Sequence, residues 1–573
     1  MKRWTLKDAV PEEAHKALSA FPRVLASMLW RRGIRTEEEA RRFLEPDWDR
    51  DVHDPFLFLD MKKAVDRIMR AKEAGEKITV HGDYDADGVS GSVILAGALS
   101  AIEAEHDVFL PHRERDGYGV NVTTIEALAK SGTKVIITTD CGISNAKEVA
   151  RANELGIDVI ITDHHEFPPE LPKAYAILHP LREGETYPFR WLTGGGVAFK
   201  LAQALWTTAG LPEGHDKWLV DMAAISTVAD IGKLVEENRA LVTYGLMVLN
   251  KSRRLGLNKL IDTTWNRGGD LTAESIGFQI APRINAAGRM DHAMEAYELL
   301  VSEEPEEAER RAAVLESFNL DRRAETTRMM NEADPMAEAQ AGRNGIVLIG
   351  NDDWVGAICG LVASRVAERH HRPTIVLTKN EKGDYVGSGR SAGGFHITGA
   401  LRKLDHLLVK YGGHGAACGM TVSGEKVEAF AEAFRSLLDA ELDPKDLIPR
   451  IEIEEELELK EASKETVELL SKLEPYGEGN PKPLFLLKDV KVVSSDCLGK
   501  DGAHLRLMVA DASGARLKLI AFRMGPRAEE AAPGTALDVI VELSMNEWKG
   551  YRSPQGMVVD FRPSLVRVAA ASD

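Results

Sequence analysis

Cysteine is scarce in this chain, and its cysteines form no paired motif. The four of them, Cys141, Cys359, Cys418 and Cys497, lie far apart, which leaves no cysteine pair for a structural zinc site. No apolar run approaches the roughly 20 residues that span a bilayer, and the first residues lack the apolar core of a signal peptide. We therefore expect a reduced, cytoplasmic protein that does not contact a membrane.

Positive charge is also in short supply. The chain has 72 lysine and arginine residues against 90 aspartate and glutamate residues, which gives a formal net charge of −18. This balance argues against a protein that coats nucleic acid by bulk attraction. A local basic groove, or a metal site that offsets carboxylates, remains compatible with it. The 573 residues exceed one domain, so two to four domains are expected.

Residues 77–88 concentrate potential metal ligands. The segment opens with a short β-rich run and closes where the apolar spacing becomes helical; between them lie His81, Asp83, Asp85 and Asp87. Like charges this close repel one another, and a divalent cation is the usual relief. The alternative interpretation is a polar turn whose aspartates cap a helix.

The region from about 55 to 235 alternates strand and helix patterns, which predicts a parallel α/β sheet. Three of its predicted strands end at polar residues: 134–139 at Asp140, 158–162 at Asp163, His164 and His165, and 175–178 at His179. A later helical segment, 219–230, ends at Asp230. Ligands of open α/β sheets bind at the carboxyl ends of the strands. Imidazole with several carboxylates suits Mn²⁺, and the carboxylates would also accept Mg²⁺.

Two features of this region each allow two interpretations. Neighbouring side chains on a strand point to opposite faces, which would make one of His164 and His165 a ligand and leave the other at the surface. A turn at the strand end would instead bring both into one cleft. The glycine-rich segment 192–200 predicts either a phosphate-binding turn or close helix packing, and the packing is favoured.

A long helix is predicted over about 300–345, between two α/β lobes. The second lobe has predicted strands at 345–349 and 373–377. Two glycine-rich turns follow, and they carry Arg390, Ser391 and His414. Flexible glycines beside such side chains suit close approach to a phosphate or sugar. A tight turn network without a ligand is the alternative.

The last region predicts a β-barrel. Residues 451–459 alternate as a half-buried strand, a helix follows, and five or six short strands lie between 483 and 568. This number of strands in so short a segment suits an OB-fold, which binds single strands by stacking and backbone charge. Candidate contacts are Trp548, Tyr551 and Arg552. A purely structural barrel is the alternative.

Several motifs together resemble the DHH phosphoesterase superfamily. They are His81-x-x-x-Asp85-x-Asp87, Asp140, Asp163-His164-His165 and Thr227-Val-Ala-Asp230. Further segments resemble the bacterial single-stranded-DNA-specific exonucleases of that superfamily: residues 113–119, 281–289 and 474–481. The matches run from about residue 50 to the C-terminus, and in combination they are highly specific.

This resemblance implies an α/β fold with a DHH parallel-sheet domain, a long connecting helix, a second α/β domain and a C-terminal OB-fold barrel. The implied regions are a helical leader (1–50), a DHH catalytic domain (51–300), the connecting helix (301–345), a DHH-associated substrate-binding domain (346–448) and an OB-fold nucleic-acid-binding domain (449–573).

The resemblance also implies two metal positions, for Mn²⁺ or Mg²⁺. Their implied ligands are His81, Asp85 and Asp140 for one, and Asp87, Asp140, His164 and Asp230 for the other. Asp83 would act as an auxiliary ligand, and His165 would contact the scissile phosphate. The substrate-binding residues implied in the same way are Arg283, Asn285, Arg289, Arg390, Ser391 and His414. Interdomain salt bridging is the alternative for the first three.

The activity implied by the resemblance is 5′→3′ removal of mononucleotides from single-stranded DNA, in repair and recombination. Single-stranded DNA is the implied partner, and single-strand-binding protein and a helicase are candidate repair partners. One alternative is a phosphodiesterase for short oligoribonucleotides or cyclic dinucleotides, against which the barrel argues. Another is a non-catalytic scaffold of this fold, against which the full set of ligand positions argues.

Overall fold

The computed structural model describes residues 2–113, 115–117, 119–264, 269–548 and 551–564, apart from the side chain of Trp548. The chain forms two compact units, one of residues 47–449 and one that joins residues 1–46 to residues 450–573. Within the described ranges, every helix is too short or too polar to cross a lipid bilayer.

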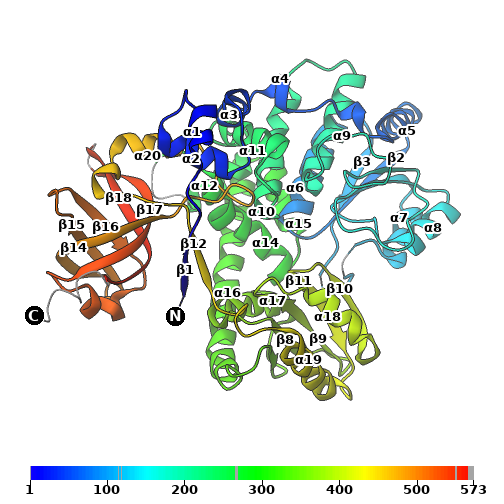
Figure 1. Ribbon diagram of the computed structural model, residues 1–573. Coiled ribbons are helices and arrows are strands. Elements are labelled where there is room, and N and C mark those ends of the chain that lie inside the picture. The colour runs from blue at the N-terminus through cyan, green and yellow to red at the C-terminus, as the bar shows by residue number, and fades with distance from the viewer. Residues whose placement is uncertain (1, 114, 118, 265–268, 549–550, 565–573) are drawn as a thin grey trace, which may run out of the picture. The chain divides into compact units, whose positions relative to one another are not determined.

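The larger unit contains an all-parallel sheet of five strands in the order β3-β2-β4-β5-β6; β2 and β3 are labelled in Figure 1. Its strands are β2 (Lys77–Gly82), β3 (His106–Phe109), β4 (Thr133–Thr139), β5 (Asp158–Thr162) and β6 (Ala176–Leu178). The chain runs from β2 to β3 on one side and returns to β4 on the other, so the strand order reverses between β2 and β4. Such a reversal opens a crevice at the carboxyl ends of the two strands.

Helices connect and follow these strands. They are α4 (Trp48–Asp51), η1 (Pro55–Leu57), α5 (Met61–Ala74), α6 (Ala86–Ala101), α7 (Val122–Lys130), α8 (Ala146–Glu154), α9 (Gly194–Thr208), η2 (Asp216–Leu219), α10 (Val220–Ala229), α11 (Glu236–Leu249), α12 (Leu255–Thr264), α13 (Ala273–Ser275), η3 (Ile276–Ile280), α14 (Ala281–Met290) and α15 (Met294–Val301).

Both faces of the sheet are covered, because successive strand residues point to opposite sides. Val135 and Ile137 of β4 belong to a core shared with α5, α6, α9 and α10. Ile136, between them, belongs to a second core shared with α7 and α8. The sequences of these strands are therefore continuously apolar, as expected for a parallel sheet that is buried on both faces.

The long helix α16 (Pro305–Glu338) links the two lobes of this unit. Its 34 residues correspond to a length of about 51 Å. The N-terminal half buries Ala312 and Leu315 in the core of the parallel sheet. The C-terminal half buries Met329 and Ala333 against the second lobe. One helix thus belongs to both cores, and it has the predicted position.

The second lobe is built on a mixed sheet in the order β10-β11-β9-β8-β7. Only the β7–β8 pair is parallel. Its elements are β7 (Ile346–Ile349), α17 (Gly356–His370), β8 (Thr374–Lys379), β9 (Tyr385–Arg390), α18 (Ile397–Lys403), η4 (Asp405–Leu407), β10 (Leu408–Gly413), β11 (Ala417–Val422) and α19 (Val427–Glu441). α16 and α17 pack on one face of the sheet, and α18 and α19 on the other.

The smaller unit contains the predicted barrel. The strands of its sheet follow the order β13-β14-β15-β16-β18-β17, and an additional β14–β17 pairing closes the barrel. Its elements are β12 (Arg450–Ile453), β13 (Glu455–Glu456), η5 (Leu459–Glu461), α20 (Lys464–Ser471), β14 (Phe485–Leu498), β15 (His504–Ala510), β16 (Arg516–Ala521), η6 (Gly525–Ala531), β17 (Ala536–Trp548) and β18 (Tyr551–Pro563). The predicted fold class is confirmed, although the strand expected over 451–459 is split into β12 and β13.

The N-terminal segment belongs to this smaller unit. Its elements are β1 (Arg3–Leu6), α1 (Glu12–Ala17), α2 (Arg23–Arg31) and α3 (Glu37–Leu44). Leu25 and Met28 of α2 share a core with Phe485 of the barrel. β1 pairs with β12 in parallel, with Arg3 opposite Arg450. The sequence analysis predicted the helices but not this strand.

Candidate metal centre

The carboxylates and imidazoles predicted at strand ends meet at one edge of the parallel sheet. Gly82 of β2 pairs with Thr139 of β4, and Thr139 pairs with Thr162 of β5. The residues that follow these three strand ends therefore lie side by side: Asp83, Asp85 and Asp87 after β2, Asp140 after β4, and Asp163, His164 and His165 after β5. The edge lies at the crevice where the strand order reverses, which is the expected place for a ligand.

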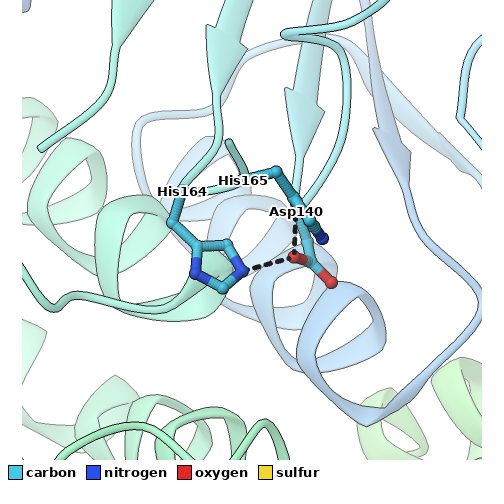
Figure 2. Close-up of side chains that lie close together, drawn as sticks. All are labelled: Asp140, His164 and His165. Atoms are coloured by element: carbon cyan, nitrogen blue, oxygen red, sulfur yellow. Dashed lines mark hydrogen bonds and ion pairs between the residues drawn. The ribbon is translucent and has the colours of Figure 1, made fainter. Parts of the chain in front are cut away.

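The ring of His164 lies close to three carboxylates, and Figure 2 shows its contact with one of them, that of Asp140. Its Nε2 atom is 3.1 Å from Oδ1 of Asp140, 3.6 Å from Oδ2 of Asp87 and 3.6 Å from Oδ2 of Asp230. Asp230 follows the last turn of α10 as its C-cap. The ligand atoms of Asp87, His164 and Asp230 all lie within 4.8 Å of one another, a spacing that fits a metal ion.

A second group with the same spacing consists of Asp83, Asp85 and Asp140. Oδ1 of Asp83, a member of this group, and Nε2 of His81 are both buried and have no hydrogen-bond partner among the described residues. Buried polar atoms are nearly always paired, so such atoms indicate a missing cation or other ligand. Oxygen ligands with an available imidazole fit Mn²⁺ or Mg²⁺. The residues present thus suit the predicted metals.

The structure groups the predicted ligands somewhat differently from the sequence. Asp85 and Asp140 come together as predicted for one position, but Asp83 is their close neighbour where His81 was expected. The ring of His81 is fully buried, with Nδ1 3.8 Å from Sγ of Cys141. For the other position, Asp87, His164 and Asp230 come together. Asp140 lies beside this second set through its contact with His164.

Backbone donors hold the aspartates of the first motif in place. The carboxylate of Asp85 caps α6 by accepting from the backbone N–H of Asp87 at 3.0 Å. The carboxylate of Asp87 accepts from the N–H groups of Gly194 and Gly195, at 2.9 and 2.7 Å, and from the hydroxyl of Ser226 at 2.6 Å. The first turn of α9 is therefore occupied by Asp87, which agrees with the packing interpretation of segment 192–200.

Glycine is required at this helix start by the closeness of the metal ligands. A Cβ atom on Gly194 would lie 2.4 Å from Cβ of Asp140, and one on Gly195 would lie 2.6 Å from Cβ of Ser226. A side chain at Gly194 would displace Asp140, and one at Gly195 would displace Ser226, whose hydroxyl donates to Asp87. Asp140 itself adopts a left-handed backbone conformation, with a φ of 62°, which aspartate and asparagine tolerate better than most residues.

Burial shifts the pKa values of several residues of the cluster. It raises the pKa of Asp140 well above its ordinary value, and the nearby carboxylates of Asp87 and Asp85 raise it further. Burial, together with Asp87, raises the pKa of Asp230 to about 8. Burial lowers the pKa of His81 to about 4, which keeps its imidazole neutral and able to bind a metal. Bound cations would replace the protons that the carboxylates otherwise retain.

His165 differs from His164 because Asp163 holds it. Nδ1 of His165 is 2.8 Å from Oδ1 of Asp163, whose other oxygen accepts from the N–H of Ile143 at 2.9 Å. Burial lowers the pKa of His165, but the hydrogen bond and charge of Asp163 raise it more, to about 9. The ring is a cation at neutral pH, and its Nδ1 is already engaged. A contact to a phosphate oxygen suits it better than metal ligation.

The sequence analysis gave Asp163 no role of its own. Its carboxylate is buried, and besides His165 it accepts from the backbone N–H of His164 at 2.7 Å. It therefore sets both the protonation of His165 and the shape of the turn that carries the two histidines. Its position at a strand end within the Asp163-His164-His165 motif was the signal that could have identified it.

One predicted substrate-binding residue reaches the metal cluster directly. The ring of His414 stacks on that of His165, with centroids 5.7 Å apart and an interplanar angle of 18°. Nδ1 of His414 also lies 3.4 Å from Oε1 of Glu166. Arg289 is near the cluster too: burial, together with the charges of Arg113 and Arg390, lowers the pKa of its guanidinium to about 9, against the opposing effect of the Asp85 carboxylate. These arginines form a positive patch within reach of the carboxylates.

The other predicted contacts make internal bonds. Arg283 pairs with Glu316 of α16 at 2.5 Å, which matches the alternative of salt bridging. Oδ1 of Asn285 accepts from the N–H of Ala86 at 2.8 Å, so Asn285 holds the start of α6. The hydroxyl of Ser391 donates to the carbonyl of Phe395.

The remaining predicted contacts are Arg390 and three residues of the barrel. Nη1 of Arg390 donates to the carbonyl of Gly389 at 2.8 Å. In the smaller unit, Tyr551 is 82% exposed, and Arg552 lies 3.9 Å from Glu547. The side chain of Trp548 lies outside the described residues. Tyr551 thus remains available for stacking.

Models of three protein families match the chain. They are described as "DHH family, N-terminal domain" over residues 77–227, "DHHA1 domain" over residues 342–440 and "RecJ OB domain" over residues 453–560. The first match contains the predicted ligands up to His164. The third contains the strands of the barrel.

Known proteins resemble the chain over nearly its whole length. The single-stranded-DNA-specific exonuclease RecJ of Bacillus subtilis is 39% identical over 538 residues, which cover 94% of this chain and 67% of that protein. The structure of RecJ from Thermus thermophilus in complex with Mn²⁺ matches with a TM-score of 0.83 at 30% identity, over 98% of this chain and 79% of that one. The complex of the same protein with Mg²⁺ matches with a TM-score of 0.78 at 29% identity, over 98% and 78%.

Proposed function

The chain belongs to the RecJ family of single-stranded-DNA-specific exonucleases, and on that premise we propose that it is a metal-dependent exonuclease that degrades single-stranded DNA. The observation that carries the proposal is the pair of ligand groups at the sheet crevice. Asp83, Asp85 and Asp140 form one group, His164 belongs to the other, and Asp140 and His164 are 3.1 Å apart. Two adjacent cation positions are typical of enzymes that cleave phosphodiesters.

The proposed ligands are drawn from the predicted residues, but Asp83, expected as an auxiliary ligand, is now proposed as a ligand of one ion. Asp83, Asp85 and Asp140 would hold one Mn²⁺ or Mg²⁺ ion, with His81 beside them, and Asp87, His164 and Asp230 would hold the other. Bound there, such ions would supply a water of lowered pKa and neutralise charge on the phosphodiester. Asp163 keeps His165 protonated, and the imidazolium of His165 binds an oxygen of the scissile phosphate. His414, stacked on His165, restricts the ring to this orientation.

In this proposal, the second lobe and the barrel bind the single-stranded DNA. Arg289 and Arg390 belong to the positive patch beside the carboxylates, where a phosphate backbone would be attracted. Arg283, Asn285 and Ser391 support this region through their internal bonds. The exposed Tyr551 offers a stacking surface on the barrel. The five regions 1–50, 51–300, 301–345, 346–448 and 449–573 are proposed as the functional divisions of the chain.

Three finer points extend the proposal. Degradation runs 5′→3′, the products are 5′-mononucleotides, and the enzyme acts in DNA repair and recombination. Candidate partners there are single-strand-binding protein and a helicase. These points rest on the motif resemblance, because the spacing of ligands does not define a direction along a strand.

A time course on end-labelled DNA tests the function. The purified protein is incubated with single-stranded DNA labelled at the 5′ end, with the 3′-labelled strand as control, in Mn²⁺ or Mg²⁺. We expect labelled mononucleotide at once from the 5′-labelled strand and only late from the other. Early release from the 3′-labelled strand would reverse the direction. Intact DNA under both metals, with cleavage of dinucleotides or cyclic dinucleotides, would assign the protein to the small-substrate phosphodiesterases.

A further inference from the structure

Two exposed side chains and one half-buried cation lie on the two loops next to the metal centre, and none of them has a role in the proposed chemistry. They are Trp191, Ile231 and Lys233, here called the rim. Ile231 is 71% exposed and Trp191 is 48% exposed. Nζ of Lys233 lies 3.7 Å from the centroid of the Trp191 ring. An apolar side chain, an indole and a cation thus share one small surface.

Two residues of the rim, Ile231 and Trp191, lie close in the chain to residues that form or hold the metal ligands. Ile231 directly follows Asp230, the most exposed of the proposed ligands of its group. Trp191 precedes Gly194 by three residues, a span of at most about 10 Å, and the N–H of Gly194 donates to Asp87. The two loops touch, because a Cβ atom on Gly232 would lie 2.9 Å from Cγ2 of Thr193.

Ile231 occupies a backbone position that suits glycine. It follows the C-cap of α10 with a φ of 58°, and the next N–H, that of Gly232, donates to the carbonyl of Thr227 at 2.8 Å. This is the usual left-handed end of a helix, where glycine avoids the strain of a Cβ atom. A β-branched residue there is a clear outlier. Its side chain is mostly exposed, so little packing offsets the strain, and such strain is typical of functional sites.

We propose that the rim contacts the bases of the terminal nucleotides of a single strand whose phosphodiester lies at the metal centre. Ile231 and the indole of Trp191 present apolar surface to the base faces, and Lys233 adds positive charge near the backbone. Base contacts of this kind tolerate any sequence, because every base has an apolar face. A base that remains paired in a duplex has its faces stacked and cannot use the rim. The inference rests on the proposed exonuclease function and deepens it.

The chain provides a matched control for a test at Ile231. Glu103 ends α6 in the same way: its φ is also 58°, and the next N–H, that of Ala104, donates to the carbonyl of Leu99 at 2.9 Å. Glu103 is exposed and lies at the far end of α6 from Asp85, about 24 Å away along a 16-residue helix. Ile231→Gly and Glu103→Gly therefore relieve the same backbone strain, but only the first alters the rim.

The experiment compares the two variants, and Trp191→Ala, on two substrates. One is an ordinary single strand, and the other carries abasic residues in its three terminal nucleotides at both ends. We expect both glycine variants to raise Tm slightly, by about 1–2 °C. Only Ile231→Gly and Trp191→Ala should raise KM for the ordinary strand, by about tenfold. On the abasic strand all variants should match the unaltered protein, because the bases that the rim contacts are missing.

Three outcomes are distinguishable. If Ile231→Gly keeps the unaltered KM on the ordinary strand, the rim does not contact bases and the inference is wrong. The inference is equally wrong if the rim variants lose as much on the abasic strand as on the ordinary one, since the loss is then unrelated to bases. If the unaltered protein degrades neither strand with Mn²⁺ or Mg²⁺, the proposed function fails first, and the rim loses its premise.

Discussion

Replacing Asp140 by asparagine should stabilise the metal-free protein while abolishing its response to metal. The side chain is almost fully buried, and one of its oxygens lies within 4.8 Å of carboxylate oxygens of Asp83 and Asp85. Asparagine keeps the shape of the side chain and tolerates the left-handed backbone at this position. The substitution therefore removes charge with little change in packing.

The size of the effect follows from the spacing. Two ionised carboxylates within 4.8 Å of each other repel by at least about 3.5 kcal/mol at an effective dielectric constant of about 20. Burial raises the pKa of Asp140, so the native protein avoids part of this repulsion by retaining a proton. We expect a net gain of about 1–2 kcal/mol, which raises Tm in EDTA by a few degrees. Loss of a ligand should weaken Mn²⁺ binding at least about 100-fold.

Thermal unfolding in EDTA and across a MnCl₂ series measures both effects. Asp221→Asn is the matched control, because Asp221 is also buried but pairs with Arg254 at 2.9 Å, away from the cluster. That variant should lose stability and keep the full Mn²⁺ shift. A lower Tm of Asp140→Asn in EDTA, together with a retained Mn²⁺ shift, would refute the reasoning, since Asp140 would then be a structural residue.

Three further predictions concern charge. Glu237→Gln should lower the free energy of unfolding in urea by about 3 kcal/mol, because it removes the opposite charge, 3.0 Å away, from the fully buried ammonium of Lys200 and leaves the carbonyl of His53 as a neutral partner. In EDTA, Tm should fall progressively as pH rises from about 4 to about 8: the pKa of Asp230 is raised from 3.8 to about 8 in the folded protein, so this stability is fully present below about pH 4 and is lost by about pH 8, and saturating Mn²⁺ should remove the loss. Asp163→Asn should lower the pKa of His165 from about 9 toward its usual value, and the alkaline limb of the rate–pH profile should move to lower pH with it.

The position of the metal centre was predictable from the sequence because it depends on topology. Three apolar runs, each ending in acids or histidines, are sufficient to predict parallel strands with ligands at one edge. The predicted strand ends at residues 139 and 162 agree with β4 and β5. The long helix and the barrel were also predictable, since their patterns extend over many residues. A hydrophobic pattern of this length can still be recognised when single residues depart from it.

The parts that escaped prediction depend on side-chain direction or on distant partners. The grouping of Asp83 with Asp85 and Asp140 depends on side-chain direction, which the spacing of the motif does not define. His81 lies on β2, with its ring centroid 5.2 Å from that of Phe109, whereas Asp83 lies beyond the strand end. Asn285 resembles a substrate contact until its bond to the N–H of Ala86 is known. The four residues of β1 carry no alternation long enough to detect, and their partner, β12, lies more than 400 residues away in the chain.

Ile231 is a residue whose strained backbone points to a functional role only once the structure is known. In the sequence it is an ordinary apolar residue after a proposed ligand. The backbone shows that it stands at a position where glycine would be more stable, and its exposure shows that burial does not compensate. Natural sequences are mostly consistent at each level of structure, and residues that depart from this consistency are concentrated at functional sites. The strained, exposed side chain beside Asp230 is therefore a better guide to substrate contact than the more numerous polar residues nearby, most of which are engaged in internal hydrogen bonds.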